Sequence, residues 1–264
     1  GDRKAALGLL QNLYLAEPDS VQVANEFAFA LCECNLWSMA SEHLVKIVGK
    51  FPFDARSKHL LARCAMQSGD FSKAQSYLEQ ASLLSPYNVS RLCDLAEVFL
   101  NQYELDQALG SFRQALELDP DCSPARQGEL QCELLLGTAN DALKLLRQLE
   151  DPSQFASVFN GAAIIAVRTG HFQQGIKLYQ SAVSQLSAHP DLSSRVFFNM
   201  GLGLYKWGKR KLAVQAFDRA VELDAGNDKA IHNAKALSEK YGRPEGLKED
   251  EYFDDDDLFE QAIA

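Results

Sequence analysis

A proline recurs every 34 residues through the first half of the chain, at Pro18, Pro52, Pro86 and Pro120. Each of these prolines closes a stretch whose apolar residues have the spacing of a helix. A single compact core does not require an interval that is kept four times, whereas a stack of one repeated helical unit does. The interval therefore predicts a solenoid of helices without a β-sheet.

Three other positions keep the same 34-residue frame. Twelve residues before the prolines stand four small residues, Ala6, Ala40, Ala74 and Ala108. Small residues at these positions let neighbouring helices approach closely. Two residues after the first three prolines stand Ser20, Asp54 and Asn88, which are good helix N-caps. Residues suited to a tight turn lie near 35, 69, 103, 137, 170 and 208, so each unit is predicted to be two helices joined by a turn.

The repeated unit resembles the tetratricopeptide repeat, most clearly at Leu95, Ala96, Phe99, Ala108, Phe112, Ala115 and Pro120. The resemblance continues less regularly through the second half, where about four extra residues lie between Gly170 and Gly208. It implies an all-α, right-handed superhelical solenoid of about six to seven helix pairs. A C-terminal capping helix would cover the last core face.

We expect residues 1–241 to form this solenoid and residues 242–264 to form an acidic tail. The predicted units are a partial repeat at 1–20, full repeats at 21–54, 55–88, 89–122, 123–154, 156–189 and 194–227, and a capping helix at 228–241. Because residues 2–17 match a second helix without its first, we expect the chain to be a fragment of a longer protein.

Composition and motifs argue against several classes of function. No apolar stretch is long enough to span a membrane, and the six cysteines have neither Cys-x-x-Cys spacing nor a nearby histidine. The sequence contains no phosphate-binding loop, hydrolase elbow, metalloprotease motif or EF-hand. We therefore expect a cytoplasmic protein that is not an enzyme and that uses no cofactor or metal.

The net charge of −10 is concentrated at one end of the chain. The segment from residue 245 to residue 264 has nine acidic residues and one basic residue, which leaves −2 for the rest. A nearly neutral solenoid lacks the basic stripe that binding to a phosphate backbone requires. We expect neither nucleic acid nor a membrane as a partner.

The resemblance implies that the first helix of each pair lines a concave groove. The candidate groove residues on these helices are Asn25, Phe29, Arg56, His59, Arg63, Asp94, Glu97, Gln127, Gln131, Asn160, Arg168, Arg195, Asn199 and Tyr205. The family's carboxylate clamp uses Lys and Asn where this chain has Asn25 and Phe29, or His59 and Arg63. This difference argues against binding of chaperone C-termini.

Asn160 and Asn199 each follow a phenylalanine on successive first helices. An asparagine amide can donate to and accept from an extended peptide backbone, although a local backbone group is an equal alternative partner. We therefore predict a non-enzymatic scaffold that binds a peptide or helix of a partner protein in the groove.

The acidic tail interleaves its carboxylates with Tyr252, Phe253, Leu258 and Phe259. These apolar residues suggest docking on a basic partner, on the chain's own solenoid or on a second copy, which would be self-association. A solvated terminus is the alternative interpretation.

Two other functional interpretations remain open. The run from residue 85 to the final repeats, including residues 196–209, is similar to the repeat half of bacterial response regulators that join a receiver domain to tetratricopeptide repeats. That resemblance implies an output module controlled by phosphorylation. The other alternative is the regulatory subunit of an enzyme whose catalytic domain lies outside this sequence.

Overall fold

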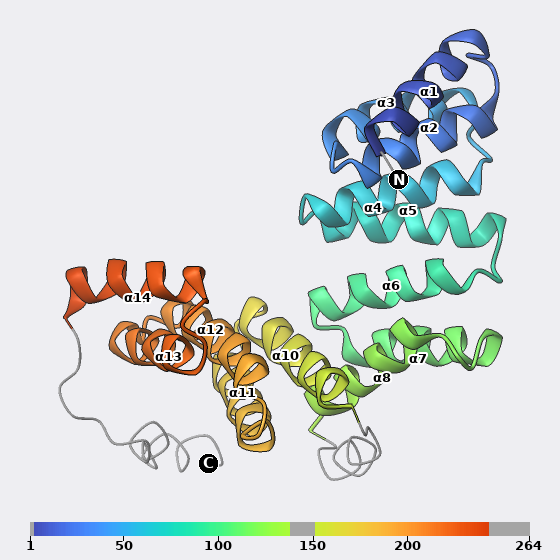
Figure 1. The fold of residues 1–264 in the computed structure, drawn as a ribbon. Coiled ribbons are helices and arrows are strands. Elements are labelled where there is room, and N and C mark those ends of the chain that lie inside the picture. Colours follow the sequence, from blue (N-terminus) through green and yellow to red (C-terminus); the bar gives the residue numbers. More distant parts are fainter. Residues whose placement is uncertain (1–2, 138–150, 243–264) are drawn as a thin grey trace. The chain divides into compact units, whose positions relative to one another are not determined.

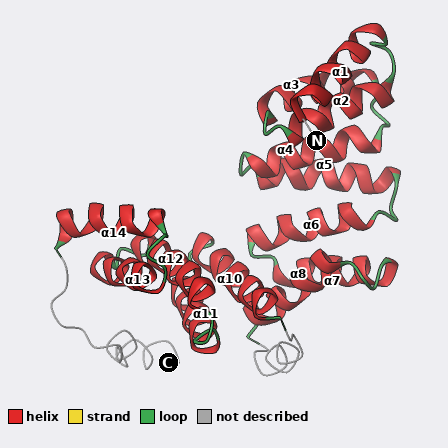
Figure 2. Cartoon of the chain, viewed as in Figure 1, coloured by secondary structure: helices red, strands yellow, loops and turns green. Residues whose placement is uncertain are grey.

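The computed structural model describes residues 3–137 and 151–242, and every regular element in these two ranges is a helix (Figures 1 and 2). The chain forms two compact units, unit 1 from Gly1 to Cys132 and unit 2 from Glu133 to Ala264. The predicted all-α fold, a helical repeat solenoid, is confirmed.

Unit 1 contains α1 (Arg3–Ala16), α2 (Val21–Glu33), α3 (Trp37–Lys50), α4 (Ala55–Gln67), α5 (Phe71–Leu84), α6 (Val89–Gln102), α7 (Leu105–Leu118) and most of α8 (Ser123–Leu135). Unit 2 contains α10 (Pro152–Arg168), α11 (Phe172–Gln185), α12 (Pro190–Lys206), α13 (Arg210–Leu223) and α14 (Asp228–Tyr241). We call the first helix of each pair an A helix (α2, α4, α6, α8, α10 and α12) and the second a B helix. The two helices of a pair pack side by side, as α4 does with α5 and α12 with α13 (Figure 1).

The turns that follow the A helices lie where the sequence predicts them. Residues 35, 69, 103, 137, 170 and 208 all have a positive φ. Four of them are glycine, which adopts this conformation without a steric penalty. The other two are Asn35, with a φ of 59°, and Tyr103, with a φ of 63°. A bulky residue such as Tyr103 is uncommon in the left-handed region, so this turn is held by its surroundings rather than by its own preference.

The three predicted N-caps also form. The side chain of Ser20 accepts from the backbone N–H of Val23, and that of Asn88 accepts from the N–H of Arg91 at 2.9 Å. Asp54 accepts from the N–H of Ser57 at 2.7 Å. Each cap satisfies one backbone donor that the first turn of a helix leaves without an intrahelical partner.

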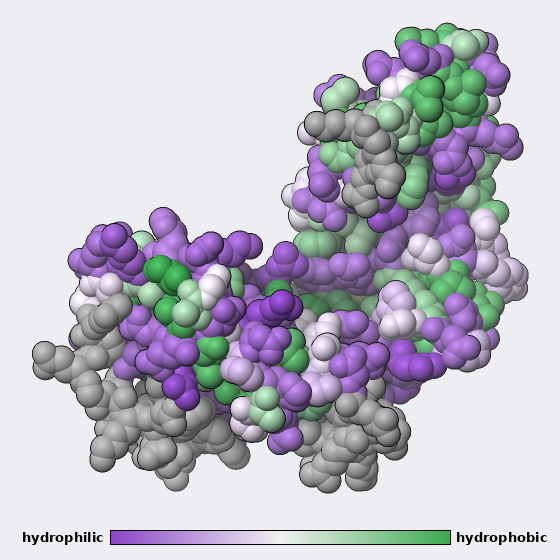
Figure 3. All heavy atoms as spheres, viewed as in Figure 1, coloured by the Kyte–Doolittle hydropathy of each residue, from purple (hydrophilic) through white to green (hydrophobic). Residues whose placement is uncertain are grey.

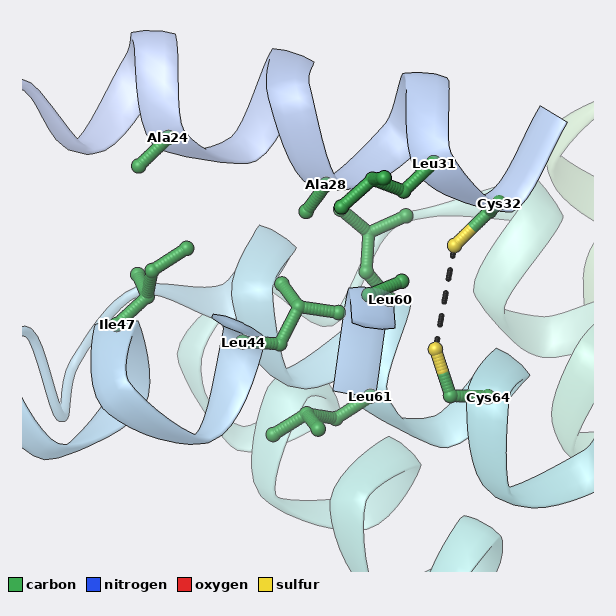
Figure 4. Close-up of a cluster of buried hydrophobic side chains, with 10 residues drawn as sticks. Ala24, Ala28, Leu31, Cys32, Leu44, Ile47, Leu60, Leu61 and Cys64 are labelled. Atoms are coloured by element: carbon green, nitrogen blue, oxygen red, sulfur yellow. Dashed lines mark hydrogen bonds between the residues drawn. The ribbon is translucent and has the colours of Figure 1, made fainter. Parts of the chain in front are cut away.

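The core of unit 1 follows the small-residue positions of the frame. Ala40, Ala74 and Ala108 expose none of their surface, and Ala6 is exposed on α1 at the end of the described stack. Figure 4 shows how leucines from neighbouring helices fill the space beside such alanines, for instance Leu44 beside Ala28. Close helix contact therefore occurs where the alanines permit it.

The core of unit 2 combines fully buried alanines, such as Ala213 and Ala220, with large aromatic side chains. Phe159, Tyr179 and Phe217 are almost completely buried. The ring of Phe217 lies so close to Gly201 that a Cβ placed there would be 2.7 Å from it. Figure 3 shows a largely hydrophilic surface around α14, the last helix of the described residues.

Candidate functional site

The A helices of unit 1 join their predicted groove residues to one another. The Arg56 guanidinium on α4 lies 2.8 Å from a carboxylate oxygen of Glu26 on α2. On the next pair of A helices, Nε2 of His59 lies 2.7 Å from Oδ2 of Asp94, and Nε of Arg63 lies 4.0 Å from the same oxygen. A ligand on this part of unit 1 would have to replace contacts that the chain already makes.

Asn25 was predicted to face the groove, and this prediction is wrong. Its side chain is only 2% exposed, and its Nδ2 donates to Oδ2 of Asp54 at 2.8 Å. Its Oδ1 accepts from the hydroxyl of Ser57, also at 2.8 Å. Asn25 therefore connects α2 to the start of α4, because its buried amide needs hydrogen-bond partners and Asp54 and Ser57 provide them.

The same contacts determine the ionisation of Asp54. Burial alone would raise the pKa of this carboxyl, but hydrogen bonds from Ser57 and Asn25 and the nearby Arg56 charge outweigh it. The pKa of Asp54 is therefore lowered from its usual value of 3.8. The shift has a structural origin and does not indicate a catalytic acid.

The remaining predicted residues of unit 1 have different surroundings. Phe29 is partly buried and packs against the core of unit 1. Glu97 on α6 is exposed, whereas Gln127 and Gln131 on α8 are half-buried. Their different degrees of burial give these residues no common role.

Unit 2 brings together the two asparagines that the sequence analysis singled out. Nδ2 of Asn199 on α12 donates to Oδ1 of Asn160 on α10 at 2.9 Å. The sequence analysis considered a bound peptide backbone or a local backbone group as the partner of each asparagine, and it did not consider the other asparagine. An amide has two N–H donors and a carbonyl oxygen with two lone pairs, so one bond between them leaves capacity on both sides. Both side chains are half-buried.

The two helices that carry this asparagine pair also carry exposed cationic and apolar side chains. Arg168 at the end of α10 and Arg195 near the start of α12 are exposed, and Tyr205 is 46% exposed. The sequence analysis missed Leu202, which is 44% exposed although its type is usually buried. Leu202 lies three residues after Asn199 and seven after Arg195, so helical periodicity could have placed it on their face.

Lys206 is the second residue that the sequence analysis missed. Its Nζ donates to the backbone oxygens of Val167 at 3.3 Å and Arg168 at 3.1 Å. These carbonyls belong to the last turn of α10, where a cation is favourable. We call Asn160, Arg168, Arg195, Asn199, Leu202, Tyr205 and Lys206 the A face of unit 2.

Four of the six cysteines form two close pairs. Sγ of Cys32 lies 3.9 Å from Sγ of Cys64 in the core shown in Figure 4. Sγ of Cys93 lies 3.8 Å from Sγ of Cys122, and burial together with this neighbour raises the pKa of Cys93 to about 12. No group of three or more His, Cys, Asp or Glu residues suited to a metal ion occurs in residues 3–137 and 151–242.

Two other findings concern the described helices and the tail. No helix in the described ranges has both the length and the apolar character needed to cross a membrane. The tail residues Tyr252, Phe253, Leu258 and Phe259 lie outside the described residues.

Comparisons with known proteins agree with the repeat pattern. One family profile, described as tetratricopeptide repeat, matches residues 93–157, and a second of the same description matches 55–88 and 194–227. Together these segments make up half of the chain.

Two curated proteins are similar to part of the chain. Protein CTR9 homolog of Arabidopsis thaliana is 27% identical over 161 residues, which cover 61% of this chain and 12% of that protein. The DnaJ homolog subfamily C member 7 homolog of Schizosaccharomyces pombe is 23% identical over 173 residues, which cover 66% of this chain and 32% of that protein. The chain thus corresponds to a third or less of each relative.

Among solved structures, a tetratricopeptide repeat protein from Parabacteroides merdae superposes with a TM-score of 0.60. The match covers 90% of this chain and 93% of the other at 13% identity. At this identity the likeness concerns the fold alone.

Proposed function

Because the chain belongs to the tetratricopeptide repeat family and is a protein–protein interaction scaffold, we propose that it binds an extended peptide of a partner protein on the A face of unit 2. The observation that carries this proposal is the hydrogen bond between Asn199 and Asn160. This bond holds two side-chain amides, each suited to hydrogen-bonding a peptide main chain, at a fixed distance on neighbouring A helices.

An extended peptide presents alternating N–H and C=O groups, each of which loses water when it binds. The free donor of Asn160 and the remaining lone pairs of Asn199 match these groups. Since the bond between the two amides already orients both side chains, binding costs less side-chain entropy than it would with two mobile asparagines. The pair therefore supports recognition of a peptide main chain.

The other residues of the A face suggest the side chains of the partner. Leu202 and Tyr205 offer exposed apolar surface on the helix that carries Asn199. The A helices α10 and α12 contain Arg168, Arg195 and Lys206 but only one acidic residue, Asp191. A peptide that combines carboxylates with an apolar side chain complements such a surface.

Unit 1 is less suited to this role. Its A-helix charges are paired across neighbouring helices, as Arg56 is with Glu26 and His59 with Asp94. A peptide would have to compete with these partners, whereas the asparagine pair of unit 2 accepts further hydrogen bonds without breaking its own. No observation in the described ranges favours the response-regulator or enzyme-subunit alternatives, which stay predictions.

The proposal is tested with a phage-displayed library of random 16-residue peptides selected on the full chain. The affinity of a selected peptide is then measured by fluorescence anisotropy for the double variant Asn160→Ala, Asn199→Ala. Each lost hydrogen bond to a peptide group should cost about 1–3 kcal/mol, which is about 5- to 150-fold in Kd.

The matched control is Arg56→Ala with Arg63→Ala, a double change on an A helix of unit 1. We expect this control to bind the selected peptide as the unaltered chain does. If the control loses affinity and the asparagine variant does not, the peptide site lies in unit 1 and the proposal fails.

A further inference from the structure

The turn that joins α12 to α13 carries an unusual density of positive charge. Lys206, Lys209, Arg210 and Lys211 place four bases within six residues of a chain whose net charge is −10. Beside this turn is a cavity of about 340 Å³ lined by Gly208, Lys209, Arg210, Lys211, Leu212 and Tyr241. We call it the basic turn pocket.

Aromatic rings hold two of these cations at the surface. Nζ of Lys209 lies 5.4 Å from the centre of the Trp207 ring. The Arg210 guanidinium carbon lies 4.9 Å from the centre of the Tyr241 ring. Such cation–π contacts keep a long side chain extended without neutralising its charge.

The described residues provide no carboxylate for this pocket. Across residues 3–137 and 151–242, no Asp or Glu lies within ion-pair distance of Lys209, Arg210 or Lys211. Elsewhere in unit 2 a basic residue does have such a partner, since Arg219 lies 2.8 Å from Glu222. The basic turn pocket thus combines uncompensated positive charge with apolar surface from Leu212 and Tyr241.

One segment of the chain has the complementary chemistry. Residues 249–264 contain eight acidic residues and no basic ones. They also contain the apolar side chains of Tyr252, Phe253, Leu258 and Phe259. The segment is therefore suited to both features of the basic turn pocket.

We propose that residues 249–264 dock in the basic turn pocket of the same chain. Tyr241 lines the pocket and is the last residue of α14, so residue 249 follows only eight positions later. Eight residues reach at most about 27 Å when fully extended, which keeps the acidic segment close to the pocket. Such a short connection raises the local concentration of the segment to about the millimolar range, so individually weak ion pairs are sufficient.

In the docked state, carboxylates of the Asp254–Asp257 run pair with Lys209 and Lys211, and an aromatic side chain packs on Leu212 and Tyr241. The inference goes beyond the proposed function because it requires no partner protein, and no residue of the A face lines the basic turn pocket. Peptide selection on the A face and docking of the tail can therefore succeed or fail separately.

Zero-length carbodiimide cross-linking of the full chain tests the proposal. The reagent couples a lysine amine to a carboxylate that touches it, and mass spectrometry identifies the joined peptides. Lys229 and Lys235 are the internal controls, because both are exposed on α14, outside the pocket lining, and closer in sequence to the acidic segment than Lys209 and Lys211. Docking predicts that residues 249–260 couple mainly to Lys209 and Lys211, whereas a freely moving terminus couples mainly to the controls. The second result overturns the proposal.

A variant gives an independent measurement. Docking shields the bonds after Tyr252 and Phe253, so chymotrypsin should cut there faster in Lys209→Gln with Lys211→Gln. Each exposed ion pair contributes about a 1.5- to 5-fold change in the docking equilibrium. The matched control, Lys229→Gln with Lys235→Gln, removes the same charge from α14 and should leave the rate unchanged.

Salt and isotope labelling complete the test. Cleavage of the unaltered chain should accelerate in 1 M salt, where the Debye length is only about 3 Å. Equal cleavage rates in both double variants and in both salts would refute docking. Cross-links between a heavy-labelled and an unlabelled copy would refute the assignment to the same chain. The cross-linking of the unaltered chain decides the question even if a lysine variant fails to fold.

Discussion

Replacing Asp54 with alanine tests how unit 1 joins one repeat to the next. Asp54 accepts from the Ser57 N–H and from the buried amide of Asn25. Loss of the N-cap costs about 0.5–2 kcal/mol. The Asn25 donor is then left buried without its partner, which costs about 1–3 kcal/mol more. We expect Asp54→Ala to lower the free energy of unfolding of unit 1 by about 1.5–5 kcal/mol.

Urea denaturation of the full chain measures this loss. The chain has two tryptophans, so in a Trp207→Phe background the fluorescence of Trp37 on α3 reports on unit 1. Asn88→Ala is the matched control, because Asn88 caps α6 by accepting from the Arg91 N–H. Its removal should cost only the capping contribution of about 0.5–2 kcal/mol. If Asp54→Ala costs no more than Asn88→Ala, the buried amide does not depend on Asp54 and the reasoning is refuted.

The effect of Asp54→Ala also depends on pH. The pKa of Asp54 is lower in the folded chain than its usual value of 3.8, because hydrogen bonds and Arg56 favour the carboxylate despite burial. A lowered folded pKa gives stability that is fully present above the unfolded pKa and is lost as the pH falls through the folded pKa. The difference in stability between Asp54→Ala and the unaltered chain should therefore be constant near neutral pH and shrink below about pH 4.

Three further predictions follow from the packing. Ala108 exposes no surface, so Ala108→Leu should cost about 1–3 kcal/mol by overpacking in urea denaturation, and an unchanged midpoint would contradict this. The buried guanidinium of Arg91 donates to the carbonyl oxygen of Ala81 at 2.9 Å, so Arg91→Met should cost about 1.5–3 kcal/mol in the same assay. Because burial and Cys122 raise the pKa of Cys93 to about 12, iodoacetamide should alkylate Cys93 slowly at pH 8 and faster as the pH rises, and rapid labelling at pH 8 would contradict this.

The repeat architecture is predictable because it depends on local sequence in a fixed frame. The interval between prolines places the turns, and the alanines of that frame mark close helix contacts, as Ala74 and Ala108 show. These features need no knowledge of distant residues. Helical periodicity also places Arg56 and His59 on an A-helix surface.

The site was less predictable because pairing between repeats depends on residues about 30–40 positions apart. Helix geometry predicted that Asn25 faces a groove. It could not show that the Asn25 amide instead donates to Asp54, the N-cap of the next A helix. It likewise identified Asn160 and Asn199 without showing that they bond to each other. A comparison of charged residues on successive A helices, aligned by the repeat frame, would have found Glu26 as the partner of Arg56.

Photo-cross-linking tests the central claim, that a partner peptide binds the A face of unit 2, most directly. Tyr205 is exposed on α12 of unit 2, and Glu97 is exposed on α6 of unit 1. A benzophenone amino acid is placed at position 205 in one sample and at position 97 in another, and each is irradiated with the same library-selected peptide. The proposed function predicts covalent capture from position 205 and none from position 97. Capture from position 97 alone would contradict it.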